Sequence, residues 1–203
     1  MRQDWFPTPI WHFQYENFQD LNKCLQTSIL QNKELDPQGI SVSNVLGWHS
    51  QDNFHKKEAF KEFTDIVTDI ALKIAQEMMW DLDRVRPTIN NCWATINPQN
   101  AFNSLHHHPN SILSGVYYVK VPKNSGNLYF YDPRAGAQML MPPYLQMTTW
   151  TIGKIIYTPI EGMFAIFPSW LWHGVESNCS EESRISLSFN IGTLNIRQPN
   201  AKH

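Results

Sequence analysis

The sequence predicts a mostly β domain with helices (an α+β fold), in which a jelly roll or antiparallel sandwich is backed by helices on one outer face. Before Pro87, apolar residues recur every three or four positions, which is the period of an amphipathic helix. After Pro87 this period disappears, and short β-rich runs alternate with turn residues. Neither an internal repeat nor a low-complexity linker divides residues 1–203, so we expect a single domain.

Helices are expected in the first part of the domain, residues 1–87, which we interpret as a support region that also carries an N-terminal strand. Over residues 55–80 the apolar positions keep the helical spacing throughout. A shorter helix is expected over residues 18–30, ended before the turn residues DPQG at 36–39.

The jelly-roll core is expected over residues 88–195. Turn residues at 122–126, 132–136 and 142–143 separate its strands. The expected strands are 88–96, 112–121, 127–131, 154–158, 163–167 and 184–191.

Composition limits the classes of function. The formal net charge of −2 gives no electrostatic footprint for nucleic acid or for an anionic membrane, so neither partner is expected. No run approaches the roughly 18 apolar residues of a membrane span, and residues 1–18 lack the apolar region of a signal peptide. Cys24, Cys92 and Cys179 form no CxxC pair, which fits a reducing compartment. We therefore expect a cytoplasmic protein.

Three adjacent histidines in the stretch SLHHHPNS at 104–111 suggest a metal site. On an extended segment His106 and His108 project to one side and His107 to the other. Two imidazoles so placed can reach one ion at about 2.1 Å each. The candidate for a third ligand is His173, which follows the apolar stretch FAIFPSWLW.

The segment RISLSFN at 184–190 alternates strictly between polar and apolar side chains, with Arg184 at its start. We expect the apolar face to pack on the helices and the polar face to carry Arg184 into the barrel. A buried guanidinium needs a partner, either an acid of the chain such as Asp132 or Glu161, or the carboxylate of a ligand.

These motifs together resemble the iron(II)- and 2-oxoglutarate-dependent oxygenases of the prolyl-hydroxylase-like superfamily. The resemblance lies in the HxH motif, SGVYY, FPSWLWH, and an Arg-x-Ser that begins eleven residues past the distal histidine. The blocks SNVLGWHSQ, GNLYFYDPR and RISLSFN are similar to a bacterial and phage branch of these enzymes, and the similarity extends over nearly the whole chain.

The resemblance implies a double-stranded β-helix (jelly roll, cupin-like) that holds one iron at its open end. His106 matches the proximal ligand, His173 the distal ligand, and Arg184 the residue that pairs with the far carboxylate of 2-oxoglutarate. Ser186 would add a hydroxyl to that carboxylate. Tyr118 matches a tyrosine that binds the co-substrate, with Tyr117 as the alternative.

One position departs from the family pattern, which is HxD or HxE. Position 108 is a histidine, so the expected carboxylate is missing. We favour a metal site formed by His106, His108 and His173. Two alternatives are a carboxylate from another strand, for which Asp132 is the best candidate, and a register shifted to His108 and Asn110.

The resemblance implies a dioxygenase that uses Fe(II), 2-oxoglutarate and O2, hydroxylates an unknown small molecule or protein side chain, and converts 2-oxoglutarate to succinate and CO2. One alternative is a cupin-like metal- or ligand-binding module without turnover. Another is a three-histidine iron dioxygenase that does not use 2-oxoglutarate, in which Arg184 would bind the carboxylate of the substrate.

Aromatic residues near these motifs are candidates for the walls of a substrate pocket. We name Trp48, His49, Trp170 and Trp172 as candidate wall residues, and Arg134 as a candidate contact for an acidic substrate. Trp and Pro residues near the amino terminus suggest a homodimer.

Overall fold

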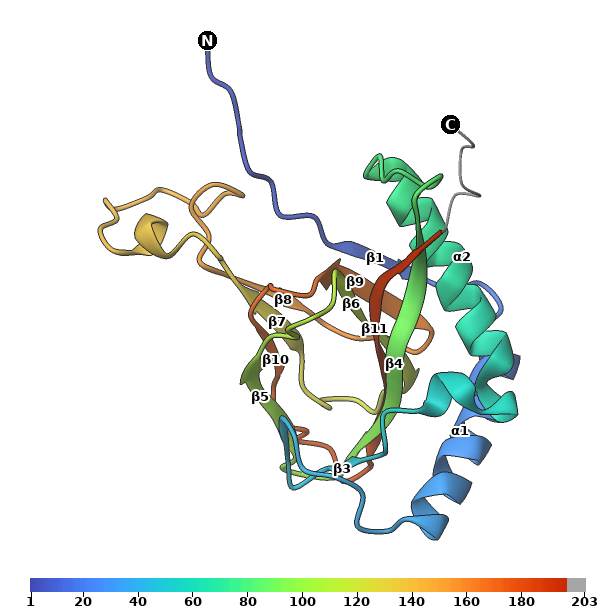
Figure 1. The fold of residues 1–203 in the computed structure, drawn as a ribbon. Coiled ribbons are helices and arrows are strands. Elements are labelled where there is room, and N and C mark those ends of the chain that lie inside the picture. Colours follow the sequence, from blue (N-terminus) through green and yellow to red (C-terminus); the bar gives the residue numbers. More distant parts are fainter. Residues whose placement is uncertain (197–203) are drawn as a thin grey trace, which may run out of the picture.

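The computed structural model describes residues 1–196, which form two facing β-sheets with helices on the outer side of one of them (Figure 1). The last part of the predicted domain, residues 197–203, lies outside the described residues. The six-stranded sheet contains, in spatial order, β1 (Trp11–Gln14), β9 (Met163–Pro168), β6 (Leu113–Lys120), β11 (Arg184–Asn195), β4 (Val85–Asn97) and β3 (Trp48–His49). The five-stranded sheet contains β2 (Asn44–Val45), β5 (Phe102–His106), β10 (His173–Val175), β7 (Leu128–Tyr131) and β8 (Lys154–Tyr157).

All pairings between these strands are antiparallel, so the jelly roll predicted from the sequence is confirmed. Strand β11 lies in the middle of the six-stranded sheet, between β4 and β6. The expected strands did not include β2, β3, β5 and β10; β5 has five residues, and the other three have only two or three. Strands of two or three residues are too short to display an alternating pattern.

The helices α1 (Phe18–Leu35) and α2 (Lys61–Glu77) cover the outer face of the six-stranded sheet. The expected helix over 55–80 was too long, because its first residues form the short 3-10 turns η1 (Phe54–Lys56) and η2 (Glu58–Phe60). Phe54 and Phe60 are both buried, with ring centroids 4.3 Å apart. The two turns direct both rings into the core.

The main hydrophobic core lies between the helices and the six-stranded sheet. Phe63 of α2 is fully buried there, and its ring lies 5.5 Å from Tyr117 and 6.0 Å from Phe189. The apolar face of β11, with Ile185 and Leu187, belongs to this core, as its alternation predicted. The opposite face of β11 therefore points between the two sheets.

A smaller apolar cluster fills part of the space between the sheets. Phe130 of β7 and Phe167 of β9 meet there edge to face, with ring centroids 4.7 Å apart. The remaining interior is polar and forms a cavity that the side chains of Arg184 and Ser186 line.

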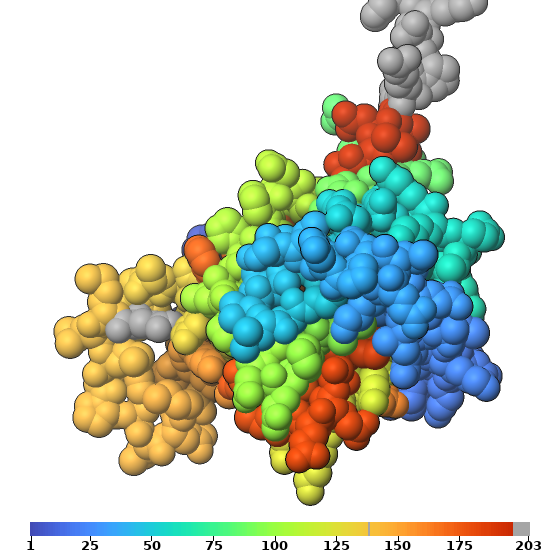
Figure 2. Space-filling view, turned by 90° about the horizontal axis from the view of Figure 1, so that it is seen from below, coloured from blue at the N-terminus to red at the C-terminus, as the bar shows by residue number. Residues whose placement is uncertain are grey.

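A long connection, residues 132–153, joins β7 to β8 and contains the short helix η3 (Ala135–Gln138). We call it the arm. Figure 2 shows it, in yellow and orange, as a lobe beside the body of the molecule. Within the described part of the chain, no helix has both the length and the apolar character needed to cross a membrane.

Candidate metal centre

The antiparallel pairing of β5 with β10 brings two histidines face to face. His106 ends β5 and His173 begins β10, and these two residues are direct partners in the register. Their ring centroids lie 4.3 Å apart. The sequence separates the two residues widely, so only the sheet can bring them together.

His108 completes a cluster with these two residues. Its backbone N–H donates to the carbonyl of Ser169, in the segment before β10, at 2.9 Å. Its ring centroid lies 4.9 Å from that of His106 and 5.1 Å from that of His173. His107 points elsewhere, and its ring meets Trp172 edge to face at 4.5 Å.

Backbone carbonyls orient two of the three imidazoles. The Nδ1 of His106 lies 2.6 Å from the carbonyl oxygen of Ser104, and the Nδ1 of His173 lies 2.8 Å from that of Leu171. A carbonyl oxygen only accepts hydrogen bonds, so each Nδ1 carries the proton and each Nε2 presents a free lone pair. This is the tautomer in which a histidine binds a metal through Nε2.

The donor set fits a divalent transition metal. One nitrogen from each of His106, His108 and His173 lies within 4.8 Å of the other two. Nitrogens that share one ion at about 2.1 Å lie about 3.0–3.4 Å apart in octahedral or tetrahedral geometry, so the rings need to close by up to about 1.4–1.8 Å when an ion binds. Three imidazoles with no opposing cation form a site suited to iron, zinc or copper.

No carboxylate among the described residues belongs to this cluster. The carboxylate of Asp132, the alternative ligand, accepts two hydrogen bonds from the Arg134 guanidinium. Nε donates to Oδ1 at 3.0 Å, and Nη2 donates to Oδ2 at 2.8 Å. The Arg134 guanidinium thereby lowers the pKa of the Asp132 carboxyl. Asn110, the ligand in the shifted register, is exposed in a left-handed turn with φ of 66°.

Burial keeps the three imidazoles neutral. Loss of water around the ring lowers the pKa of His108 to about 3 and lowers the pKa of His106 in the same direction. The pKa of His173, the most buried of the three, falls well below its ordinary value for the same reason, and its neighbour His106 lowers it further. A neutral imidazole is the form that binds a metal.

Arg184 lies at the inner end of the same cavity, 2% exposed. Its Nη1 donates to the backbone carbonyl of Ser125. Within residues 1–196 it forms no ion pair, because Asp132 binds Arg134 and Glu161 accepts from the backbone of Val121. Burial lowers the pKa of Arg184, yet the guanidinium remains charged at any physiological pH.

Hydroxyl groups surround this unpaired cation. Tyr118 and Ser186 are register partners on β6 and β11, and both side chains line the cavity. The buried hydroxyls of Tyr118 and Ser125 have no hydrogen-bond partner among the described residues. Tyr117, the alternative to Tyr118, instead donates to Asn22 of α1 at 2.6 Å on the helix side of the sheet.

The residues proposed as pocket walls lie apart from one another. Trp48 is buried in the helix-side core, where its Nε1 donates to the carbonyl of Asp36. His49 is buried and stacks on Trp93 at 5.4 Å, one ring removed from the histidine cluster. Trp172 and Trp170 are half exposed, and neither lines the cavity that holds the histidines.

Sequence reasoning missed several residues that line the cavity. Trp93 and Thr95 of β4 project into it, and Trp93 lies against His108 with ring centroids 5.6 Å apart. Asn97, on the same face of β4, pairs in register with Arg184. The alternation argument used for residues 184–190 would have found Trp93 and Thr95 if applied to 88–96. Ser125, which lies in a turn, carries no such signal.

The buried neutral histidines predict an acid-sensitive metal-free protein. Below about pH 6.5 the unfolded chain binds more protons than the folded chain, so the free energy of unfolding falls by up to about 1.4 kcal/mol per pH unit for each such histidine. For His108 the loss extends downward toward pH 3, where its folded form also protonates. Urea denaturation from about pH 7 to about pH 5 measures this slope. His108→Gln should make the dependence of the free energy of unfolding on pH less steep, and the exposed control His107→Gln should leave it unchanged. Equal slopes in the wild type and both variants would contradict the interpretation that His108 is buried in its neutral form.

Comparison with known proteins agrees with this geometry. Residues 91–190 match the family model described as "Putative 2OG-Fe(II) oxygenase". The matched segment contains the histidine cluster, Tyr118, Arg184 and Ser186. Among curated proteins, none matches the sequence significantly.

Solved structures share the fold at low sequence identity. A prolyl-4-hydroxylase from Pseudomonas putida superposes with a TM-score of 0.64 and 15% identity, over 90% of this chain and 91% of that chain. A Trichoplax adhaerens prolyl hydroxylase, in complex with a hypoxia-inducible factor peptide, superposes with a TM-score of 0.63 and 14% identity, over 90% of this chain and 83% of that chain. A Streptomyces hygroscopicus protein with nickel, 2-oxoglutarate and hygromycin B bound superposes with a TM-score of 0.60 and 8% identity, over 91% of this chain and 83% of that chain.

These similarities establish the fold, and the family match covers the segment that supplies the buried histidines and the unpaired arginine. Residues 91–190 of the chain are thus similar to the 2OG-Fe(II) oxygenase family.

Proposed function

We propose that the protein is an Fe(II)- and 2-oxoglutarate-dependent dioxygenase that hydroxylates a small molecule or a protein side chain. One observation carries the proposal: the cavity between the sheets has a metal-ligand cluster at one end and an unpaired guanidinium at the other. Both ends favour negative charge once a metal is bound. A dicarboxylate such as 2-oxoglutarate has a matching charge at each end.

His106, His108 and His173 are the proposed iron ligands. All three are neutral, so they offset none of the charge of a divalent ion. A dianionic co-substrate would offset that charge. The metal end of the cavity therefore favours a carboxylate ligand, as Arg184 does at the other end. Three protein ligands also leave coordination positions open for a co-substrate and for O2.

Arg184 is the proposed partner for the far carboxylate of 2-oxoglutarate, through two parallel hydrogen bonds. The hydroxyls of Tyr118 and Ser186 would donate to the same carboxylate. Burial raises the pKa of Tyr118 to about 12, which keeps its proton in place at neutral pH. The free buried hydroxyl of Tyr118 would then gain the partner that it lacks within the chain.

When bound, iron(II) together with 2-oxoglutarate supplies the oxidation of a C–H bond by O2, with conversion of 2-oxoglutarate to succinate and CO2. The chain contributes position and shielding. Phe167 and Leu128 line the cavity beside the histidines and limit the access of water. The half-exposed Trp172, whose ring contacts His107, is the proposed contact for the substrate at the rim.

The absence of a carboxylate from the metal cluster favours a second candidate function. A three-histidine iron dioxygenase that does not use 2-oxoglutarate would place the carboxylate of its substrate on Arg184. A cupin-like binding module would use the same residues without turnover. The titrations below separate both from the principal proposal.

Three further properties remain predictions. We infer one domain, because the helices and the six-stranded sheet share a continuous core. A cytoplasmic location, with no nucleic-acid or membrane partner, rests on the charge and composition of the chain. The homodimer rests on the Trp and Pro residues near the amino terminus, and sedimentation velocity at micromolar concentration tests it.

The metal site predicts unequal effects for two neighbouring histidines. His108→Ala should weaken the binding of Fe(II) or Co(II) at least about 100-fold, because even the loss of an outer hydrogen-bond partner weakens metal sites 10–100-fold. His107→Ala, an exposed neighbour, should leave the affinity unchanged. Anaerobic isothermal titration measures both, with Asp132→Asn as the test of the alternative ligand. A large loss in Asp132→Asn and none in His108→Ala would overturn the three-histidine site.

The co-substrate site predicts a specific loss in Arg184→Met. Removing the guanidinium should raise the dissociation constant of 2-oxoglutarate about 100-fold, since charge-assisted hydrogen bonds contribute about 2–3 kcal/mol. Arg84→Met, at an arginine that is 76% exposed, is the matched control. The measurement is the charge-transfer absorption band that forms when 2-oxoglutarate is added anaerobically to the Fe(II) protein. Metal binding with neither this band nor a thermal shift on addition of 2-oxoglutarate would favour the two alternative functions.

A further inference from the structure

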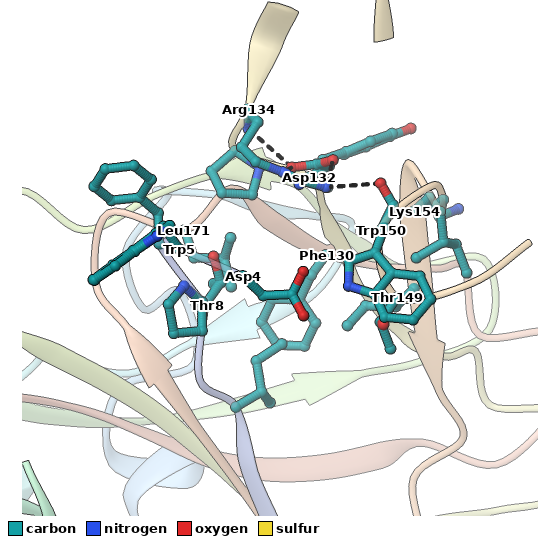
Figure 3. Close-up of a pocket in the computed structure, with 17 residues that line it drawn as sticks. Asp4, Trp5, Thr8, Phe130, Asp132, Arg134, Thr149, Trp150, Lys154 and Leu171 are labelled. Carbon is teal, nitrogen blue, oxygen red and sulfur yellow. Dashed lines mark hydrogen bonds and ion pairs between the residues drawn. The ribbon is translucent and has the colours of Figure 1, made fainter. Parts of the chain in front are cut away.

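A second cavity, of about 360 Å3, lies between the N-terminal segment and the arm (Figure 3). It shares no lining residue with the cavity at the metal centre. Phe130 and Leu171 form its deepest part, and both are almost completely buried. The ring of Phe130 separates the two cavities, because its centroid lies 6.0 Å from that of His173.

Aromatic side chains that remain in contact with water form the walls of this cavity. Trp5 lies on one side and Trp150 on the opposite side in Figure 3. Trp5 is 72% exposed and Trp150 is 49% exposed, although large aromatic residues are usually highly buried. Exposed aromatic surface around a cavity is typical of a site that binds an apolar ligand.

The charged side chains of the lining are already paired. Asp132 binds Arg134 through two hydrogen bonds. Asp4 pairs with Arg2 at 3.1 Å, and Lys154 with Glu176 at 3.6 Å.

The arm adds no further charge, because residues 135–153 contain no Asp, Glu, Lys, Arg or His. An ionic ligand would have to break one of the existing pairs. The Arg2 guanidinium, which pairs with Asp4, also stacks over the Trp150 ring at 3.9 Å. The lining therefore offers no unpaired charge to an ionic ligand, which favours an uncharged one.

We propose that this cavity binds an uncharged, ring-bearing apolar molecule that contacts Trp5 and Trp150. Its volume lies within the roughly 300–1,000 Å3 that is typical of small-molecule sites. Thr8 and Thr149 also line the cavity, and neither hydroxyl forms a hydrogen bond within the described chain. These hydroxyls give the ligand one or two polar contacts that fix its orientation.

The position of this site links its ligand to the metal centre indirectly, through Leu171. The side chain of Leu171 lines the cavity, and the carbonyl of the same residue accepts the hydrogen bond from Nδ1 of His173. A bound molecule would thus touch the residue that orients one proposed iron ligand. The site itself needs no metal and goes beyond the proposed oxygenase activity.

The test is a titration of the metal-free, full-length protein with N-phenyl-1-naphthylamine, an uncharged aromatic probe that fluoresces in apolar surroundings. We expect saturable binding to one site. Trp150→Ala and Trp5→Ala should each weaken this binding about tenfold, the equivalent of about 1.4 kcal/mol for a lost aromatic contact. Because the two residues lie on different segments, a local distortion of either one does not account for both losses.

Trp170→Ala is the matched control, since Trp170 is 52% exposed and does not line the cavity. Its affinity for the probe should equal that of the wild type. The anionic analogue 8-anilinonaphthalene-1-sulfonate, which carries similar rings, should bind about tenfold more weakly, because no free cation receives its sulfonate. Binding that does not saturate, an equal loss in Trp170→Ala, or equal affinity for the anionic analogue would overturn the proposal. None of these outcomes depends on iron or 2-oxoglutarate, so they leave the oxygenase proposal to its own tests.

Discussion

The arrangement of the whole molecule depends on strand β11 having two different faces. One face packs Ile185, Leu187 and Phe189 against the helices. The other turns Arg184 and Ser186 into the space between the sheets. A shift of one residue in the register would exchange these two sets, which would bury a guanidinium in the main core and empty the cavity of its cation. The long pairings of β11 with β4 and β6 prevent such a shift.

The interior cavity lowers the stability of the fold, because polar groups in it are buried without partners. A guanidinium without a carboxylate partner and a tyrosine hydroxyl without a hydrogen bond each destabilise the fold by leaving buried polar groups unsatisfied. The helix-side core, which includes Phe63, Tyr117 and Phe189, offsets this with extensive aromatic packing. Buried polar groups without partners are expected where a ligand supplies the missing contacts, and this separates the binding face of the sheet from its structural face.

Sequence alone predicted those features in which a regular pattern was long enough to read. The alternation over residues 184–190 identified both faces of β11, and Arg184 and Ser186 line the cavity as expected. The pairing of His106 with His173 was not readable from local pattern, because β10 has only three residues and its register is set by its neighbours. The residue pattern named His173 only as a candidate third ligand, and the resemblance to a family then matched it to the distal ligand.

Local interactions account for the other differences between sequence and structure. The expected helix over 55–80 begins later because Phe54 and Phe60 both turn inward. Asp132 appeared available as a metal ligand, but an arginine two residues away binds it at short range. Trp48 appeared suited to a pocket wall, but its indole donates to a nearby carbonyl and packs under the helices. In each case a partner within about twelve residues in the sequence accounts for the outcome.

The three-histidine cluster changes the charge of the site as well as its ligands. With a carboxylate in place of His108, a divalent ion would keep a net charge of about +1, whereas three neutral imidazoles leave about +2. Arg184 adds one further positive charge, and no acid among the described residues lines the cavity. Without metal, the guanidinium alone attracts an organic acid; with metal, the attraction acts at both ends of the cavity. The same residues therefore couple the binding of the metal to the binding of the acid, and they favour a dianion over a monoanion because only a dianion satisfies both ends.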